Sequence, residues 1–134
     1  MTIEQLEQYR GLQAEIDAMK AEIETLYNPV ASPNGRTDTG HGSTPGNPTE
    51  RTALRIIERK QTLEQKRNDA LALLDKIDAW VNVVADAQVR ALIRWYFICG
   101  LTWKATSIKV YGYPCPQRAH QRVHRYFSEE NASV

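Results

Sequence analysis

Residues 87–128 read AQVRALIRWYFICGLTWKATSIKVYGYPCPQRAHQRVHRYFS, and this stretch decides the fold. Two glycines and two prolines divide it into short segments: Gly100, Gly112, Pro114 and Pro116. Glycine commonly ends a helix, and proline is favoured in the first turn of one. The apolar residues between these breaks recur at helical spacing. We therefore predict three short helices, over residues 87–99, 102–111 and 116–127.

The same stretch has no aspartate or glutamate but contains seven basic residues. Residues 1–86 hold 14 acidic and 10 basic residues, so the formal net charge of +1 conceals an acidic part and a basic part. When the charges of a protein are divided in this way, its electrostatic field orients a polyanion toward the basic surface. Aromatic residues are interleaved with the basic ones. This part of the chain therefore has side chains that can form a core as well as charges that attract a polyanion. The pattern favours nucleic-acid binding.

Composition places the chain among ordinary globular proteins. It has 134 residues, of which 42% are hydrophobic and 25% charged. No apolar run approaches the roughly 20 residues that span a bilayer. The N-terminus lacks the basic start and apolar core of a secretory signal. We expect a cytoplasmic protein with no membrane association, in which Cys99 and Cys115 are reduced thiols.

Residues 1–27 are predicted to form an N-terminal coiled-coil helix. Thr2 and Gln5 fit a capping box, which satisfies exposed amide donors at a helix start. The apolar seam alternates spacings of three and four residues, with Tyr9, Leu12, Ile16, Met19, Ile23 and Leu26. Residues 28–49 contain four prolines and four glycines, and are predicted to be a flexible loop in which the chain reverses direction.

A long connecting helix is predicted over residues 50–85. Asn47, Pro48 and Glu50 suit its first positions. An apolar residue recurs at every seventh position, giving Ile56, Leu63, Ala70, Ile77 and Val84. We expect an all-α protein, in which an N-terminal antiparallel helical hairpin or coiled coil leads into a C-terminal three-helix head. That head, over residues 86–128, is predicted to be a helix-turn-helix DNA-binding domain.

The last predicted helix carries the candidate DNA-binding residues. In a helix-turn-helix the second helix enters the major groove. Arginine can make two contacts to guanine, and glutamine two to adenine. The candidates for base reading are Gln117, Arg118, Gln121 and Arg122. His124 and Arg125 lie further along and are expected at phosphates, with Thr102, Lys104 and Lys109 bracing the backbone. The alternative is that these side chains form only a solvated helix face.

The segment VRALIRWYFICGLTWKATSIKVYGYPCPQRAHQRVHRYF resembles phage and prophage regulators built like sigma factor region four. The matching pieces are Arg90 to Phe97, Gly100 to Trp103, Gly112 with Tyr113, and Arg118 to Tyr126. The resemblance implies a sequence-specific DNA-binding protein of the late transcription regulator type. It places Gln117, Arg118, Gln121, Arg122 and Arg125 at the DNA. This chain departs from the family in having Thr106-Ser107 for an Ile-Ala pair, and Pro-Cys-Pro for a serine-led helix start.

Two further functions remain open. Small terminase subunits also place a helix-turn-helix beside coiled-coil helices, in DNA packaging. The other alternative is a protein-interaction module whose basic surface docks on an acidic host protein or a defence complex. The expected partners are double-stranded DNA and further copies of the chain through the N-terminal helices, as a homodimer or higher homo-oligomer. RNA polymerase or another host protein is a further candidate partner.

No catalytic, metal or cofactor site is predicted. His120 and His124 have the spacing of two metal ligands, and Cys115 lies one turn upstream, but a fourth ligand is absent nearby. Neither cysteine has the surroundings that activate a nucleophile. The chain is therefore not expected to be an enzyme. The tryptophans are expected to pack rather than to stack on bases.

Overall fold

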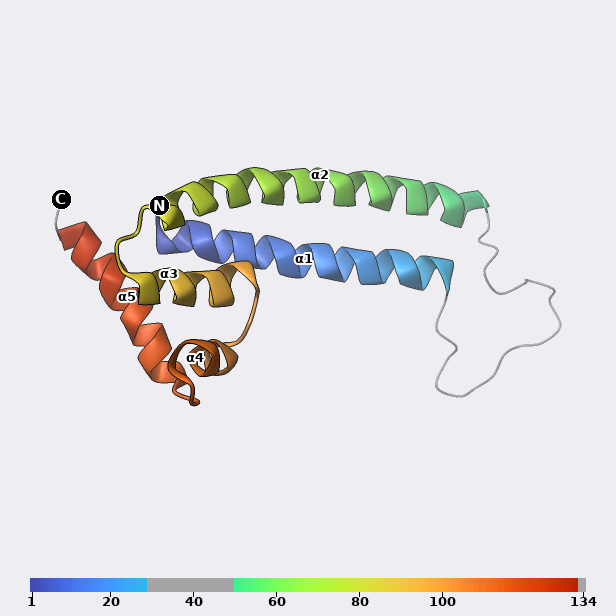
Figure 1. Ribbon diagram of the computed structural model, residues 1–134. Coiled ribbons are helices and arrows are strands. Elements are labelled where there is room, and N and C mark those ends of the chain that lie inside the picture. Colours follow the sequence, from blue (N-terminus) through green and yellow to red (C-terminus); the bar gives the residue numbers. More distant parts are fainter. Residues whose placement is uncertain (29–49, 133–134) are drawn as a thin grey trace. The chain divides into compact units, whose positions relative to one another are not determined.

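A computed structural model describes residues 1–28 and 50–132 of the chain. Every regular element in this part is helical, which confirms the predicted all-α class. The elements in Figure 1 are α1 (Ile3–Tyr27), α2 (Glu50–Asn82), α3 (Ala87–Ile93), the π-helix η1 (Arg94–Ile98), α4 (Trp103–Tyr111) and α5 (Pro116–Ala132). None of these helices is both long and apolar enough to cross a membrane. The predicted loop lies outside the described residues except for Asn28, as do Asn47 and Pro48.

The described residues form two compact units. The large unit contains Met1–Gln13 together with the described residues from Asp69 onward, and the small unit is Ala14–Asn68. Helices α1 and α2 each contribute one half to each unit. The first 13 residues therefore belong to the same unit as α3, α4 and α5.

The small unit buries part of the apolar seam that the sequence predicts, since Met19 and Leu26 are only half-buried. Its buried residues are Ile16, Ile23, Ile56 and Leu63. Two ion pairs join its helices, Lys66 to Glu15 at 2.9 Å and Arg59 to Glu22 at 3.2 Å. As the residue numbers rise along α1 the partners fall along α2, as in two helices that run in opposite directions. Both pairs are exposed, so each stabilises the fold by about 1 kcal/mol or less.

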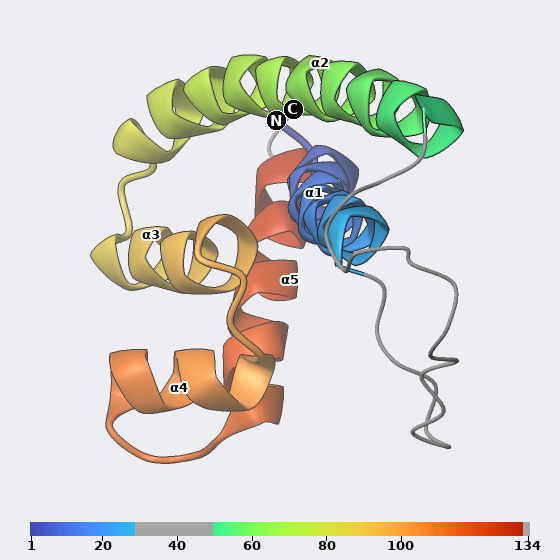
Figure 2. The same ribbon diagram turned by 90° about the vertical axis from the view of Figure 1, so that its right-hand side faces the viewer.

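The core of the large unit lies among α3, α4 and α5, which pack against one another (Figure 2). Fully buried side chains come from every part of this unit: Leu6, Ile77, Val81, Val89, Leu92, Ile93, Phe97 and Val123. The end of α2 thus enters this core, as its apolar heptad positions predict. The expected packing role is confirmed for Trp80, because its ring stacks on the Phe127 ring with centroids 5.6 Å apart.

Most helix boundaries follow the capping chemistry in the sequence. Thr2 and Gln5 exchange the two bonds of a capping box, at 2.9 and 3.3 Å. Thr102 caps α4 by accepting a bond from the Ala105 amide at 3.1 Å. At the end of α4, Gly112 adopts a φ of 87°, a left-handed conformation that glycine takes without steric cost. These predicted caps are confirmed.

The predicted helix over residues 87–99 is not a uniform α-helix. It changes at Arg94 into the π-helix η1, where the Cys99 amide bonds the Arg94 carbonyl at 2.8 Å. Within η1, Phe97 is buried while Tyr96 stays half-buried and stacks on Trp103 at a centroid distance of 3.7 Å. A wider turn of this kind has no signature in residue propensity. The last helix is also longer than predicted, since α5 continues to Ala132.

Ser107 and Thr106, the two departures from the region-four pattern, are both fully buried. Ser107 Oγ donates to the Lys104 carbonyl at 2.7 Å and accepts from the Cys115 amide at 2.8 Å. Ser107 thereby fastens the turn between α4 and α5 just before Pro116 starts α5. Thr106 Oγ1, in contrast, has no hydrogen-bond partner among the described residues.

Replacing these two residues tests that difference. Ser107→Ala leaves the Cys115 amide without its acceptor, and should lower the free energy of unfolding by about 1–3 kcal/mol. Thr106→Val removes a hydroxyl that makes no bond and keeps the side-chain shape, so stability should be unchanged or higher. Urea unfolding followed by circular dichroism measures both. An equal loss in both variants would contradict this account of the turn.

Candidate functional site

The polar face of α5 is set by the apolar stripe on its other side. Ala119, Val123 and Phe127 are buried at spacings of four residues. The opposite side is therefore turned to solvent. The exposed polar residues on it are Gln117, Arg118, His120, Gln121 and Arg125, whereas Arg122 and His124 are half-buried.

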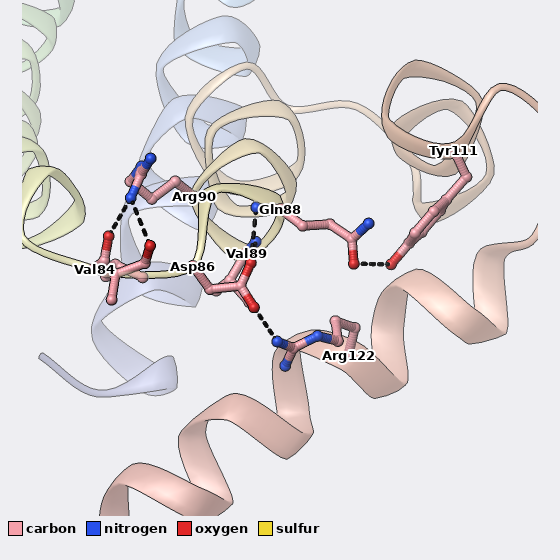
Figure 3. A network of polar contacts seen from close by, with 8 residues as sticks. Val84, Asp86, Gln88, Val89, Arg90, Tyr111 and Arg122 are labelled. Atoms are coloured by element: carbon pink, nitrogen blue, oxygen red, sulfur yellow. Dashed lines mark hydrogen bonds and ion pairs between the residues drawn. The ribbon is translucent and has the colours of Figure 1, made fainter.

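Arg122 is held inside the large unit by Asp86. The Asp86 carboxylate caps α3, accepting from the Gln88 amide at 2.9 Å and from the Val89 amide at 3.3 Å. Its other oxygen accepts from Arg122 Nη2 of α5 (Figure 3). The Arg122 side chain is only 27% exposed. The geometry therefore assigns Arg122 to holding α5 against α3, and a base-reading role would require this ion pair to open.

The electrostatics of Asp86 agree with its contacts. Burial on its own would raise the pKa of this carboxyl. The two backbone amides and the Arg122 guanidinium favour the charged form more strongly, so that the pKa is lowered below its ordinary value. Asp86 is thus a carboxylate whose charge the fold itself offsets.

Two more arginines of the basic stretch bind acceptors at the end of α2. Arg90 Nη1 donates to the Val84 carbonyl (Figure 3) and to the Ala85 carbonyl at 3.2 Å. Arg94 donates to Asp78 Oδ1 at 3.1 Å and to Asn82 Oδ1 at 2.9 Å. Sequence reasoning counted both as part of a basic surface. Their acceptors lie 5 to 16 residues away along the chain, so the three- and four-residue spacings of a helix do not reveal them.

Arg118 keeps its charge although it has neighbours. Its Nη1 donates to Tyr113 Oη at 2.6 Å, and its Cζ lies 4.3 Å from the centre of the Tyr111 ring. Both neighbours are neutral phenols, so the contacts orient the guanidinium without neutralising it. Arg118 remains exposed, with further N–H donors beyond the one that Tyr113 accepts.

The other predicted residues divide between the faces of α4. Lys104 is exposed and shares a helical stripe with Tyr111, seven residues later. Lys109 lies on another side, with Nζ 5.3 Å from the centre of the Trp95 ring of η1. The Thr102 hydroxyl is occupied as a helix cap. The structure therefore turns Lys109 toward η1 and leaves Lys104 exposed to solvent.

Several hollows border the exposed amides of α5, and Arg118 lines two of them. One, of about 300 Å³, is bounded by α3, α4 and α5, and its lining residues are Gln88, Tyr111, Arg118, Gln121, Arg122 and Arg125. We call it the arginine hollow. A second, of about 540 Å³, lies by the turn before α5, and its lining residues are Tyr113, Cys115, Pro116, Gln117, Arg118 and Gln121. Arg118 and Gln121 are common to both. Sequence reasoning missed Gln88, Tyr111 and Tyr113 as neighbours of the candidate residues.

The two histidines of α5 join an aromatic row rather than a DNA-facing surface. The His120 and His124 ring centroids are 4.1 Å apart, and the Trp103 ring is 5.3 Å from His120. Burial lowers the pKa of His124, and the neighbouring His120 lowers it further, against an opposing effect of Glu7. His124 is half-buried, and because its pKa is lowered its imidazole is neutral at physiological pH. Its predicted contact with a phosphate therefore gains little from charge.

No protein-family model matches the chain, and neither a known protein nor a solved structure matches it significantly. A functional assignment therefore depends on the residues and contacts described above. The resemblance to region-four regulators stays a prediction.

Substitutions at Asp86 separate its two roles. Asp86→Asn keeps an N-cap acceptor but removes the charge that faces Arg122, and should cost roughly 0.5–1 kcal/mol of unfolding free energy. Asp86→Ala removes the cap as well and should cost about 1 kcal/mol more. In the Asp86→Asn variant, the further change Arg122→Gln should lower the unfolding free energy measured with urea by little more. Full additivity of the two losses would show that the ion pair contributes nothing.

Acid should weaken the large unit through His124. Because folding lowers the pKa of His124, the unfolded chain binds the proton more readily. The unfolding free energy should therefore decline as pH falls below about 6.5, the ordinary histidine value. His124→Gln should flatten that decline, while Glu7→Gln should steepen it by removing the opposing charge. Melting temperatures measured between pH 5 and pH 8 test both; unchanged profiles would contradict the assignment.

Proposed function

We propose that this chain is a sequence-specific double-stranded DNA-binding protein, of the transcription regulator type that its sequence resembles. In this proposal α4 and α5 form a helix-turn-helix that follows an N-terminal helical hairpin, and α5 is the recognition helix. The observation that carries the proposal is the exposed polar face at the start of α5. There Gln117 and Gln121 lie one turn apart with Arg118 beside them.

The chemistry of this face suits the major groove. An α-helix fits that groove, and residues near the N-terminus of a recognition helix reach base edges. Glutamine offers a donor and an acceptor that match the exposed edge of adenine. Gln117 and Gln121 are the best candidates for this role, since both are exposed and neither side chain has a described partner holding it.

The charge of the surface supports a polyanionic partner. The stretch 87–128 has no carboxylate, and Asp86, which precedes it, is paired with Arg122. Three of the seven basic residues bind acceptors within the large unit, namely Arg90, Arg94 and Arg122. The four exposed or ring-facing cations that remain are Lys104, Lys109, Arg118 and Arg125. The basic surface is therefore weaker than the seven basic residues of the sequence predict. No acidic residue of the stretch 87–128 lies among its cations.

A homodimer is part of the proposal. Helix-turn-helix proteins commonly bind two half-sites as dimers. In the small unit, Leu54 and Ile57 are 59% and 52% exposed and lie three residues apart on α2. Two large apolar side chains on one stripe of a helix favour contact with a second copy.

DNA binding should be salt-dependent to a limited degree. Four available cations allow a slope of log K against log salt of about −4 or shallower per protomer. Fluorescence anisotropy with duplexes selected from a random pool measures this slope. A slope near −6 would mean that Arg90, Arg94 and Arg122 leave their internal partners. Absence of binding even at low salt would favour the protein-interaction module instead.

Matched variants separate recognition from attraction. Gln117→Ala and Gln121→Ala should lower the preference for the selected duplex over random duplex by about tenfold each, from the roughly 1–3 kcal/mol of one two-pronged contact. Arg55→Gln removes an exposed charge from the small unit and should leave the preference unchanged. An equal loss on every duplex after the glutamine changes would contradict base reading.

A further inference from the structure

The arginine hollow gathers an unusual set of side chains at one place. Arg118, Arg122 and Arg125 follow one another along α5 at spacings of four and three residues, so they lie on one stripe of the helix. All three line the hollow together with Gln88 of α3 and Tyr111 of α4. Figure 3 shows Gln88 and Tyr111 extending toward one another, while Arg122 extends from α5 to Asp86. Three like charges on one stripe repel each other unless an anion lies among them.

Only part of this charge is compensated within the fold. Asp86 offsets Arg122, as described above. Arg118 touches only phenols, and Arg125 is exposed. Two guanidinium charges thus remain on the wall of a hollow of about 300 Å³. Planar guanidinium groups bind phosphate oxygens with paired hydrogen bonds, which makes a phosphate group the matching anion.

The neutral lining groups suit the same ligand. Tyr111 Oη lies 3.5 Å from Gln88 Oε1, which is at the long limit of a hydrogen bond. Because it is the Gln88 oxygen that accepts from Tyr111, the two N–H donors of the Gln88 side chain are not used in this contact. The Asp86 cap fixes the turn from which Gln88 extends, so the wall on the α3 side is held before any ligand arrives.

We propose that the arginine hollow binds a single phosphate group. The source that fits its position beside Gln121 is a backbone phosphate of the duplex, an assignment that rests on the proposed function. Free phosphate carries the same group and can occupy the hollow on its own. In either case Arg118 and Arg125 hold the phosphate, and base reading is left to Gln117 and Gln121.

Titration with inorganic phosphate tests the hollow without DNA. The Nε–Hε signals of the arginine side chains are followed by NMR in the full chain, against sodium chloride of equal ionic strength. The signals of Arg118 and Arg125 should shift saturably, and those of Arg90 and Arg94 should not. Arg125→Gln should weaken phosphate binding about tenfold, from the loss of a charged hydrogen bond. Arg55→Gln, with the same loss of charge in the small unit, should leave it unchanged.

Equal, unsaturated shifts of all arginine signals would overturn the proposal. A second experiment distinguishes the source of the phosphate: displacement of a labelled duplex by phosphate, compared with chloride at equal ionic strength. Preferential displacement that disappears in Arg125→Gln supports a backbone phosphate. Saturable phosphate binding without displacement assigns the hollow to free phosphate and contradicts the backbone source. If the protein binds phosphate but no DNA, the proposed function is wrong and the phosphate site stands. If it binds DNA while the signals of Arg118 and Arg125 do not respond to phosphate, only the phosphate site is wrong.

Discussion

One carboxylate, that of Asp86, connects α3 and α5. Asp86 accepts the exposed amides at the start of α3 and the Arg122 guanidinium of α5 at the same time. A helix start needs an acceptor and a half-buried guanidinium needs a counter-charge, and a single aspartate meets both needs. Together with Ser107, which fastens the turn before α5, it supports the orientation that the buried apolar stripe of α5 sets.

The basic character of this part of the chain therefore serves two purposes. Arg90, Arg94 and Arg122 connect helix ends by donating to backbone carbonyls and to carboxylates. Arg118 and Arg125 are left on one stripe of α5, facing a hollow whose other walls are neutral. A stretch without acidic residues does not by itself form a binding surface, because its cations also find acceptors on α2 and in the segment between α2 and α3.

Local chemistry in the sequence predicted much of the fold. The caps at Thr2, Thr102 and Asp86 and the buried heptad row through Ile77 depend on neighbours within a few residues, and such patterns are readable. The internal partners of the arginines lie 5 to 36 residues away along the chain, and charge counting treats each cation as free. For the same reason the exposed glutamines of α5 were predictable from its apolar stripe, whereas the arginine hollow was not.

The large unit is discontinuous along the chain. Arg10 of α1 donates to the Leu101 carbonyl at 3.2 Å and lies over the Tyr96 ring at 4.1 Å, so the N-terminal turns are built into the same core as α3, α4 and α5. Residues 14–68 depart from that core at Gln13 and return at Asp69. The core around α5 is thus assembled from two stretches that are far apart in the sequence, and none of the contacts described for α5 comes from the small unit.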